Sequence, residues 1–366
     1  MIIKKEKAVK FIFLGFLLLT LVEFLYNNTG FSGIYSNYIY ILMAILLIIV
    51  KILINNGKIK NSIIELFLIC FIFFNGMNSF SLRYSIFFLL ILLMNDLIFE
   101  DMEKYHKLLI IVGGVYCFFQ LLFSKLRVSG YMISPTIFSC CVLISVLYLL
   151  FQKKSNNRNY IYIFLGILSI YLSKSGSTFL FAIFLVLYKI FINLLRKENS
   201  GLILKNKSKL LYYSFLFLII LIIFLVLNNL DFFLSIVNRD NRSESTNTRI
   251  YYYELFFDLL KNNSKMVFIG NGAGYVTKYI SNLITTNLYV PLHQDFLMFI
   301  CEYGLIGCGF MYVFFIKKLK MNWLLWLTLF LCSFHNFILS PSLVCLFILT
   351  NNSLNYQHNL EEKIWR

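Results

Sequence analysis

The chain consists largely of apolar stretches that are each long enough to cross a lipid bilayer. A bilayer-spanning helix needs about 20 predominantly apolar residues, and apolar stretches of about this length follow one another along most of the 366 residues. Hydrophobic residues make up 60% of the chain and charged residues 14%, against about 45–50% and about 25% in soluble domains. This pattern excludes a secreted domain, a cytosolic enzyme and a nucleic-acid-binding module. It predicts an all-α polytopic membrane protein.

The apolar pattern predicts about 12 transmembrane helices, within a range of about 10–12 because the last stretch is short. We expect them at 11–26, 36–50, 62–78, 83–98, 108–123, 132–151, 159–173, 177–195, 210–229, 294–316, 322–339 and 341–350. The chain then divides into an N-terminal transmembrane bundle of about nine spans (1–229), one large loop (230–292), the C-terminal spans (293–350) and a tail (351–366).

Basic residues predict the orientation of these helices. The chain has 33 Lys and Arg against 17 Asp and Glu, a formal net charge of +16. With the N-terminal lysines in the cytoplasm, 23 basic residues fall on the cytoplasmic side and 10 on the outer side. Cytoplasmic loops carry an excess of Lys and Arg, so we predict that both termini are cytoplasmic and that the large loop is extracytoplasmic. The first span is expected to be an uncleaved signal anchor.

The large extracytoplasmic loop contains one predicted amphipathic helix. Apolar and aromatic residues recur at helical spacing from Ile250 through Tyr253 and Phe257 to Leu260, and Asn262-Asn263 is expected to end the helix. Such a helix lies along a membrane surface. The glycine-rich run 270–274 follows; we interpret it as a structural turn, with a cradle for a ligand phosphate as the alternative.

Two histidines lie near the predicted outer ends of spans. His293 stands at the start of one span, and His335 about one turn before the outer end of another. An imidazole, with its ordinary pKa of about 6.5, suits a general base acting on a hydroxyl; a structural role at the interface is the alternative. Asp295 is a candidate to orient His293, although the two do not share a helix face. His106 and His358 are expected on solvated cytoplasmic loops.

Several basic residues lie on the outer side, which the orientation rule depletes of positive charge. They are Arg127, Arg239, Arg242 and Arg249, together with Lys125 and Lys174. The planar guanidinium suits phosphate oxygens, so this group fits a substrate whose reacting end is a lipid diphosphate. Arg239 and Arg242 have an alternative, which is pairing with Asp240 and Glu244 on a solvated loop. Arg249 opens the amphipathic helix, where the dipole disfavours a cation, and this indicates another role.

The order of these motifs resembles the O-antigen polymerase and O-antigen ligase superfamily (Wzy-type). In that superfamily an Arg precedes a helix, a G-x-G turn follows, and a His-Asn-x-x-Leu sequence leads into Glu-x-Gly-x-x-Gly. The corresponding parts here are Arg249, the turn 270–274, His293-Gln294-Asp295-Phe296-Leu297 and Glu302-Tyr303-Gly304-Leu305-Ile306-Gly307. Gln294 stands where Asn is usual.

Two upstream segments extend the resemblance. Arg127-Val128-Ser129-Gly130 followed by Pro135-Thr136 is similar to the Arg-x-Ser-Gly and Pro-Asn segments of the superfamily, with Thr136 in place of Asn. Ser173-Lys174-Ser175-Gly176 stands where Ser-Arg-Gly is usual. The resemblance covers about 127–316 in order and in topology.

The resemblance implies a metal-independent glycosyltransferase without a cofactor, acting on the outer leaflet of a bacterial cytoplasmic membrane. Its donor is an undecaprenyl-diphosphate-linked oligosaccharide. On this interpretation His293 is the general base, Arg249 and Arg127 stabilise the diphosphate leaving group, and Arg239 and Arg242 add contacts. Further auxiliary candidates are Asp295, His335 and Lys174.

A polymerase moves the growing glycan onto a sugar hydroxyl of the next lipid-linked repeat unit, and a ligase moves it onto lipid A core. A composition rich in Lys, Asn and Ile indicates a low-GC genome, and a surface polysaccharide or capsule fits this without requiring lipopolysaccharide, so we favour the polymerase. A repeat-unit flippase or other transporter is an alternative, as is a structural scaffold. A transporter is expected to show internal repeats and mid-span charges. The expected partners are membrane lipid, a chain-length regulator and a flippase, with no nucleic acid.

The predicted topology can be tested by cysteine-accessibility labelling. The eight natural cysteines fall within predicted spans, so their background reactivity should be low. Single cysteines introduced between 239 and 293 should react with a membrane-impermeant maleimide in intact cells, whereas cysteines between 196 and 209 should react only after permeabilisation. Labelling of 239–293 only after permeabilisation would contradict the predicted orientation.

Overall fold

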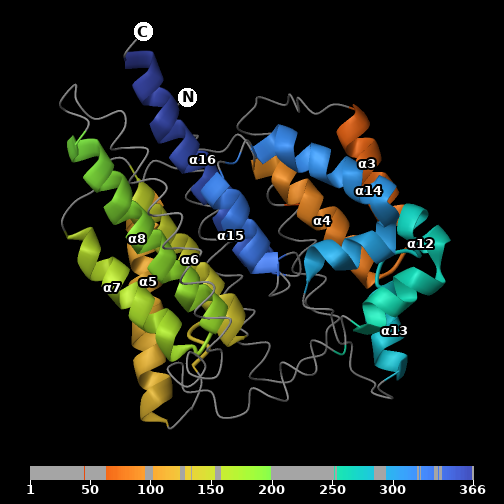
Figure 1. Ribbon diagram of the computed structural model, residues 1–366, viewed down its shortest axis with the longest axis horizontal. Helices are drawn as coiled ribbons and strands as arrows, with labels where there is room; N and C mark the ends of the chain where they lie inside the picture. Colours follow the sequence, from red (N-terminus) through yellow and green to blue (C-terminus); the bar gives the residue numbers. More distant parts are fainter. Residues whose placement is uncertain are drawn as a thin grey trace.

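The chain forms an assembly of helices (Figure 1). The computed structural model describes residues 45, 63–94, 102–123, 128–132, 134–152, 158–198, 251, 254–283, 294–319, 321, 323–333, 337 and 340–364. Within these ranges no strand occurs, and the predicted all-α class is confirmed. The labelled helices are α3 (Ile63–Phe74), α4 (Ser79–Met94), α5 (Met102–Leu122), α6 (Pro135–Phe151), α7 (Asn159–Leu172), α8 (Gly176–Glu198), α12 (Ser264–Ile269), α13 (Tyr275–Leu283), α14 (Asp295–Leu319), α15 (Trp323–Ser333) and α16 (Pro341–Ile364).

Three described helices are long and apolar enough to cross a bilayer, judged by length and composition. They are α5, α8 over Gly176–Asn193, and α14. Shorter apolar helices are α4, α6, α7 and Leu324–Ser333 within α15. Each predicted span between 62 and 195 and between 294 and 350 overlaps one of the helices α3–α8 or α14–α16. The predicted spans at 11–26, 36–50 and 210–229 lie outside the described residues, apart from Ile45.

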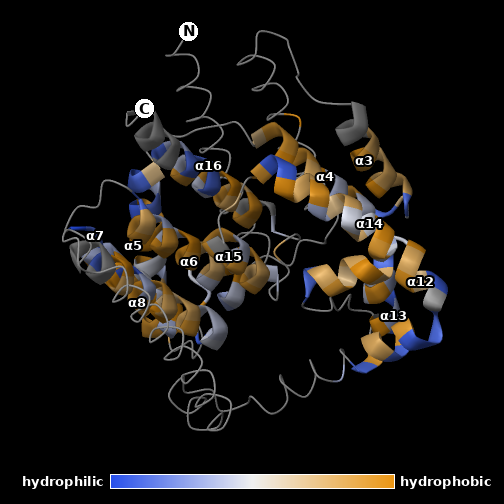
Figure 2. Ribbon diagram, turned by 45° about the horizontal axis from the view of Figure 1, so that its top comes forward, coloured by the Kyte–Doolittle hydropathy of each residue, from blue (hydrophilic) through white to orange (hydrophobic). Residues whose placement is uncertain are grey.

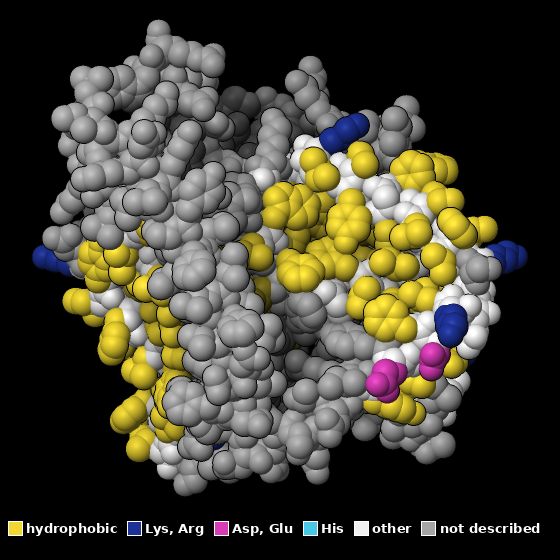
Figure 3. Space-filling model, in the orientation of Figure 1, with side chains coloured by type: hydrophobic (Ala, Val, Ile, Leu, Met, Phe, Trp, Pro, Cys, Tyr) yellow, Lys and Arg dark blue, Asp and Glu magenta, His cyan; other side chains and the backbone are white. Residues whose placement is uncertain are grey.

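The helices form two groups, with α15 and α16 between them (Figure 1). In the first group α6 contacts α5, α7 and α8, and in the second α14 contacts α4, α12 and α13. α16 contacts α6 on one side and α4 on the other. Figure 2 shows that apolar residues cover most of the helices and that polar residues gather toward helix ends. Figure 3 shows a broad apolar face over the second group, which fits contact with lipid.

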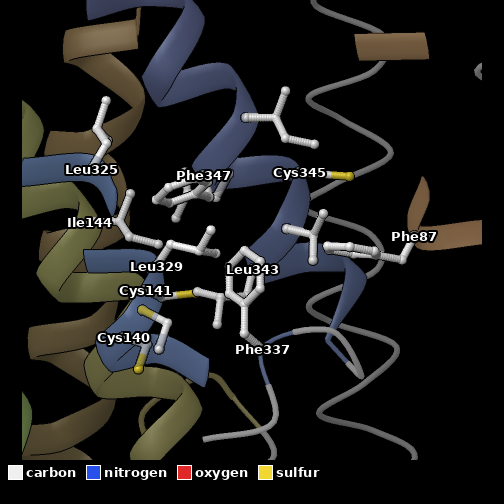
Figure 4. Close-up of a cluster of buried hydrophobic side chains, with 14 of the residues drawn as sticks. Phe87, Cys140, Cys141, Ile144, Leu325, Leu329, Phe337, Leu343, Cys345 and Phe347 are labelled. Carbon is white, nitrogen blue, oxygen red and sulfur yellow. The ribbon is translucent and has the colours of Figure 1, made fainter. Parts of the chain in front are cut away.

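A buried cluster joins the two groups (Figure 4). The ring of Phe337 lies 6.2 Å from that of Phe87 in α4 and 5.5 Å from that of Phe347 in α16. Cys140 of α6 and Leu329 of α15 are also buried in this cluster. Lipid tails are as apolar as these side chains, so helix association in a bilayer depends on close packing rather than on escape from water. The interlocked rings and thiols supply that packing.

A polar run in α16, Thr350-Asn351-Asn352-Ser353, connects the ends of other helices. The Asn351 amide donates to the carbonyl of Leu319 at the end of α14, and the Asn352 amide donates to that of Met94 at the end of α4, each at 2.6 Å. The last carbonyls of a helix have no partner within their own helix. These two amides therefore satisfy acceptors that a water-free interior would leave unpaired. The helix continues to Ile364, beyond the predicted span.

His106 is fully buried, and the expectation that it decorates a solvated loop is wrong. Its Nδ1 lies 3.0 Å from Ser145 Oγ, and its Nε2 lies 3.2 Å from Thr350 Oγ1. The ring stacks on Tyr148 with the centroids 4.4 Å apart. The predicted span began at 108, whereas α5 already begins at Met102. His106 consequently lies on a helix face that α6 and α16 cover.

Replacing Asn352 tests the connection between α16 and α4. Asn352→Ala removes the donor to the Met94 carbonyl and should lower the free energy of unfolding by about 1–3 kcal/mol, the cost of leaving a buried acceptor unpaired. Thermal melting in detergent, followed by size-exclusion chromatography, measures the effect. Asn355→Ala is the control, because its amide contacts Asn351 within the same helix. Equal losses in the two variants would contradict this interpretation.

Candidate functional site

α14 is broken at Gly304, and this break organises the candidate site. Gly304 has φ 67° and ψ 175°, so α14 consists of two helical parts that run in different directions (Figure 1). Residues with a side chain rarely adopt a positive φ of this kind. The predicted span 294–316 thus contains a sharp bend that its apolar pattern did not indicate.

Two glycines allow the backbones on either side of the break to touch. A Cβ added to Gly304 would overlap the backbone of Phe268 in α12. A Cβ added to Gly270, which has φ 80°, would overlap the backbone of Glu302 and lie 2.5 Å from the amide nitrogen of Tyr303. Each glycine therefore makes room for the main chain of the other segment. The glycine-rich turn and the second glycine motif are parts of one contact.

Backbone hydrogen bonds join the glycine-rich turn to the bend. The amide of Asn271 donates to the carbonyl of Cys301, and the amide of Gly272 donates to that of Glu302, both at 2.9 Å. These carbonyls precede Gly304, where the regular helical bonds are interrupted. The turn therefore provides partners for groups that the break exposes.

The same turn also binds the connection between α3 and α4. The amide of Ala273 donates to the carbonyl of Asn75 at 2.9 Å, and the side-chain amide of Asn78 donates to the carbonyl of Ala273 at 2.6 Å. The amides of residues 271–273 are all engaged within the protein. This confirms the structural-turn interpretation, and those amides do not form a phosphate cradle.

Gln294 begins α14 as its N-cap. Its side-chain oxygen accepts from the amide of Phe296 at 2.9 Å, and its carbonyl accepts from the amide of Met298 at 3.0 Å. The hydroxyl of Ser333, at the end of α15, lies 3.3 Å from the same side-chain oxygen. A residue that departs from the superfamily pattern therefore fixes the start of α14 and links it to α15.

Asp295 is buried in the first turn of α14, where the helix dipole favours a carboxylate. It lines a narrow internal cavity together with the rings of Phe87, Phe299 and Phe337. An open apolar groove adjoins this cavity and is lined by Phe296, Tyr312, Trp326, Leu327 and Phe330. The rings of Phe296 and Tyr312 border both spaces. The groove lies between α14 and α15.

Glu302 is a residue of this site to which the sequence analysis assigned no role. Its side chain is fully buried, and neither carboxyl oxygen makes a hydrogen bond with the described residues. An ionisable residue within an apolar transmembrane helix is expensive and usually functional. That signal was available in the sequence, because Glu302 lies within the predicted span 294–316.

Residues 128–132, which follow Arg127 in the chain, form a turn folded over Gln120 of α5. The Gln120 side-chain oxygen accepts from the amides of Ser129 at 2.9 Å and Gly130 at 3.1 Å. Ser134 then caps α6, with its hydroxyl 3.0 Å from that of Thr136. Burial raises the pKa of Tyr131 in this turn, so its phenol stays neutral.

Lys174 lies in the tight turn between α7 and α8. It has φ 52°, and its amide donates to the carbonyl of Tyr171 at 2.9 Å. A lysine in this region of backbone space is strained and is held by its surroundings. The buried hydroxyl of Ser173 donates to the carbonyl of Ile170 at 2.6 Å and helps to hold the turn.

Of the predicted site residues, the structure describes Asp295 and Lys174, which belong to different helix groups. The others lie outside the described residues: His293, Arg249, Arg127, Arg239, Arg242 and His335.

The helix predicted in the large loop is partly described and is helical over 254–262, ending where expected. Among its described side chains Phe256 and Leu259 are buried, whereas Phe257, one of the predicted apolar positions, is 59% exposed. Phe257, Phe268 and Ile269 are exposed, as a surface-lying segment requires.

These features define a helical membrane protein in which a broken helix and a glycine-rich turn frame the candidate site. Residues 161–313, from α7 into the second part of α14, match the family model described as O-Antigen ligase. The match confirms the resemblance to the O-antigen polymerase and ligase superfamily over these residues. No curated protein sequence and no solved structure matches the chain.

Replacing Gly304 tests the bend. Gly304→Ala forces a side chain into a positive-φ position against Phe268 and should destabilise the protein by about 1–3 kcal/mol. Gly309→Ala is a matched control in the same helix, because its Cβ would meet no atom within 4 Å, and it should be neutral or stabilising by about 0.5–1 kcal/mol. Thermal melting in detergent measures both variants. Equal stability of the two would show that the bend is not needed.

Proposed function

We propose that this protein polymerises lipid-linked oligosaccharide repeat units on the outer face of a bacterial cytoplasmic membrane. The observation that carries this proposal is the match of residues 161–313 to the O-antigen ligase family model, which indicates a polymerase or ligase. The donor is a glycan linked to undecaprenyl diphosphate, and the product is a surface or capsular polysaccharide.

The reaction needs one base and several cations. His293 accepts the proton of the acceptor sugar hydroxyl as its oxygen attacks the anomeric carbon of the donor. The bond from that carbon to the diphosphate oxygen breaks, and the lipid diphosphate leaves with its charge stabilised by Arg249 and Arg127. Arg239 and Arg242 contact the same diphosphate, and Lys174 and His335 are auxiliary. A diphosphate is a good leaving group, so no metal ion or covalent nucleophile is required.

The described part of the site supports this assignment through the start of α14. His293 is the residue immediately before Gln294, whose capping bonds and contact with Ser333 fix the first turn. A general base must be held within hydrogen-bond reach of its proton. A capped and packed helix start provides such a fixed point, with Asp295 buried beside it.

The apolar groove between α14 and α15 also fits a lipid-linked substrate. Phe296 stacks on Tyr312 with the centroids 5.4 Å apart and lies 6.2 Å from Phe330. An apolar chain can lie against such rings without leaving a polar group unpaired. The groove begins two residues after Gln294, at the helix start that the proposed general base His293 precedes.

Two substitutions test the proposed chemistry. His293→Ala and Arg249→Ala should each reduce polymer formation by about 100-fold or more, because a general base contributes about 100- to 10,000-fold and charge stabilisation a similar factor. Purified protein supplied with defined lipid-linked repeat units should produce a ladder of glycans, which gel electrophoresis resolves.

Matched controls and the nature of the product separate the alternatives. His358→Ala and Arg196→Ala, both on the predicted cytoplasmic side, should leave the ladder unchanged. Transfer to lipid A core without a ladder would identify a ligase. A deletion strain with no surface glycan, rather than glycan of single repeat units, would identify a flippase. Unaltered chain lengths in His293→Ala and Arg249→Ala would contradict the assigned roles.

A further inference from the structure

Glu302 lies at the contact between α13 and α14 and is not used by the proposed chemistry. Its backbone carbonyl accepts from the amide of Gly272 at 2.9 Å and from the side chain of Asn75 at 3.4 Å. Its side chain is fully buried. A buried carboxyl group is costly unless polar groups compensate it, so its surroundings have to explain its presence.

Three polar groups face this carboxyl. They are the backbone amides of Gly274 and Val276 at the start of α13 and the hydroxyl of Tyr84 in α4. They interact favourably with the carboxyl, although none meets the geometry of a full hydrogen bond. The first amides of a helix have no partner in their own helix, and an acceptor or negative charge near them is stabilising.

α13 has no side-chain cap of its own. The carbonyl of Gly274 accepts from the amide of Lys278 at 3.0 Å, which makes Gly274 the N-cap, and glycine has no side chain that accepts from the following amides. A Cβ at Gly274 would lie 2.6 Å from the ring of Phe80, so that position excludes the usual capping residues. The hydrogen-bond acceptor for the first amides of α13 therefore has to come from elsewhere in the chain. The carboxyl group of Glu302 faces these amides.

We propose that Glu302 is a positioning residue that caps α13 from α14. It fixes the start of α13 to the first part of α14, whose first residues, Gln294 and Asp295, directly follow His293 in the chain. A small displacement of that helix start would misalign a catalytic group attached to it. Glu302 thus acts on the reaction through His293; this inference rests on the proposed function.

Three substitutions at position 302 distinguish capping from proton transfer. Glu302→Gln keeps the shape and the acceptor oxygen but does not ionise, so it should retain polymerisation within about threefold of the wild type. Glu302→Ala removes the acceptor and should lower the rate by about 10- to 100-fold, the effect of a small displacement of a catalytic group. Glu302→Asp keeps the charge but shortens the reach, and it should fall with Glu302→Ala. Glu103→Gln, at a half-exposed ion pair in α5, is the control.

Hydrogen exchange provides a measurement that needs no substrate. In detergent, peptides covering 270–283 should exchange at least about threefold faster in Glu302→Asp and Glu302→Ala than in the wild type and Glu302→Gln, because the first amides of α13 lose their acceptor. If Glu302→Ala does not insert, the comparison of Glu302→Gln with Glu302→Asp decides the question.

The outcomes separate this proposal from the proposed function. Loss of activity in Glu302→Gln with full activity in Glu302→Asp would overturn it, because the charge or the proton would then be what matters. Unchanged exchange and activity in Glu302→Asp and Glu302→Ala would also overturn it. A wild-type protein that makes no glycan ladder would remove the proposed function, while the exchange data would still decide whether Glu302 caps α13.

Discussion

A helix that breaks inside an apolar environment leaves amide and carbonyl groups that water does not reach, and each unpaired group costs several kcal/mol. The break at Gly304 is tolerated because the glycine-rich turn supplies amide donors to the carbonyls of Cys301 and Glu302. The two backbones come close enough for this pairing because Gly270 and Gly304 carry no side chains. The direction of the first part of α14 depends on that contact. Consequently the start of α14 depends on a turn that lies earlier in the chain.

The same requirement explains the polar run in α16. Asn351 and Asn352 satisfy the terminal carbonyls of α14 and α4, while Thr350 contacts His106 of α5. One helix thereby joins both helix groups at their ends, and the aromatic cluster around Phe337 joins them further along (Figure 4). In a bilayer, where apolar contact gives little net gain over lipid, such polar connections and close packing determine which helices meet.

Features of the fold that depend on neighbouring residues can be predicted from the sequence. Features that depend on contacts between distant segments cannot. Ser134 followed by Pro135 marks the start of α6, because a hydroxyl cap and a proline at the first position act within one turn. The bend at Gly304 has no local signal beyond the glycine itself; it exists because Gly270 and α12 occupy the space. The solvated position predicted for His106 was wrong because the hydrogen-bonding partners of its ring lie in α6 and α16. Among the described site residues, the sequence singled out Asp295 and Lys174, whereas the link from Gln294 to Ser333 joins distant segments and could not be predicted.

The described part of the candidate site carries acidic side chains, whereas the residues proposed to contact the diphosphate are arginines. Asp295 and Glu302 lie two helical turns apart on the same face of α14 and interact with each other. Neither carboxyl group is a cation that could hold a lipid diphosphate, and the amides of the turn 271–273 are already paired with carbonyls. The described part of the site is therefore unsuited to holding the diphosphate. Its contribution is a fixed frame, and in the proposed reaction charge stabilisation is assigned to the arginines at 127 and between 239 and 249.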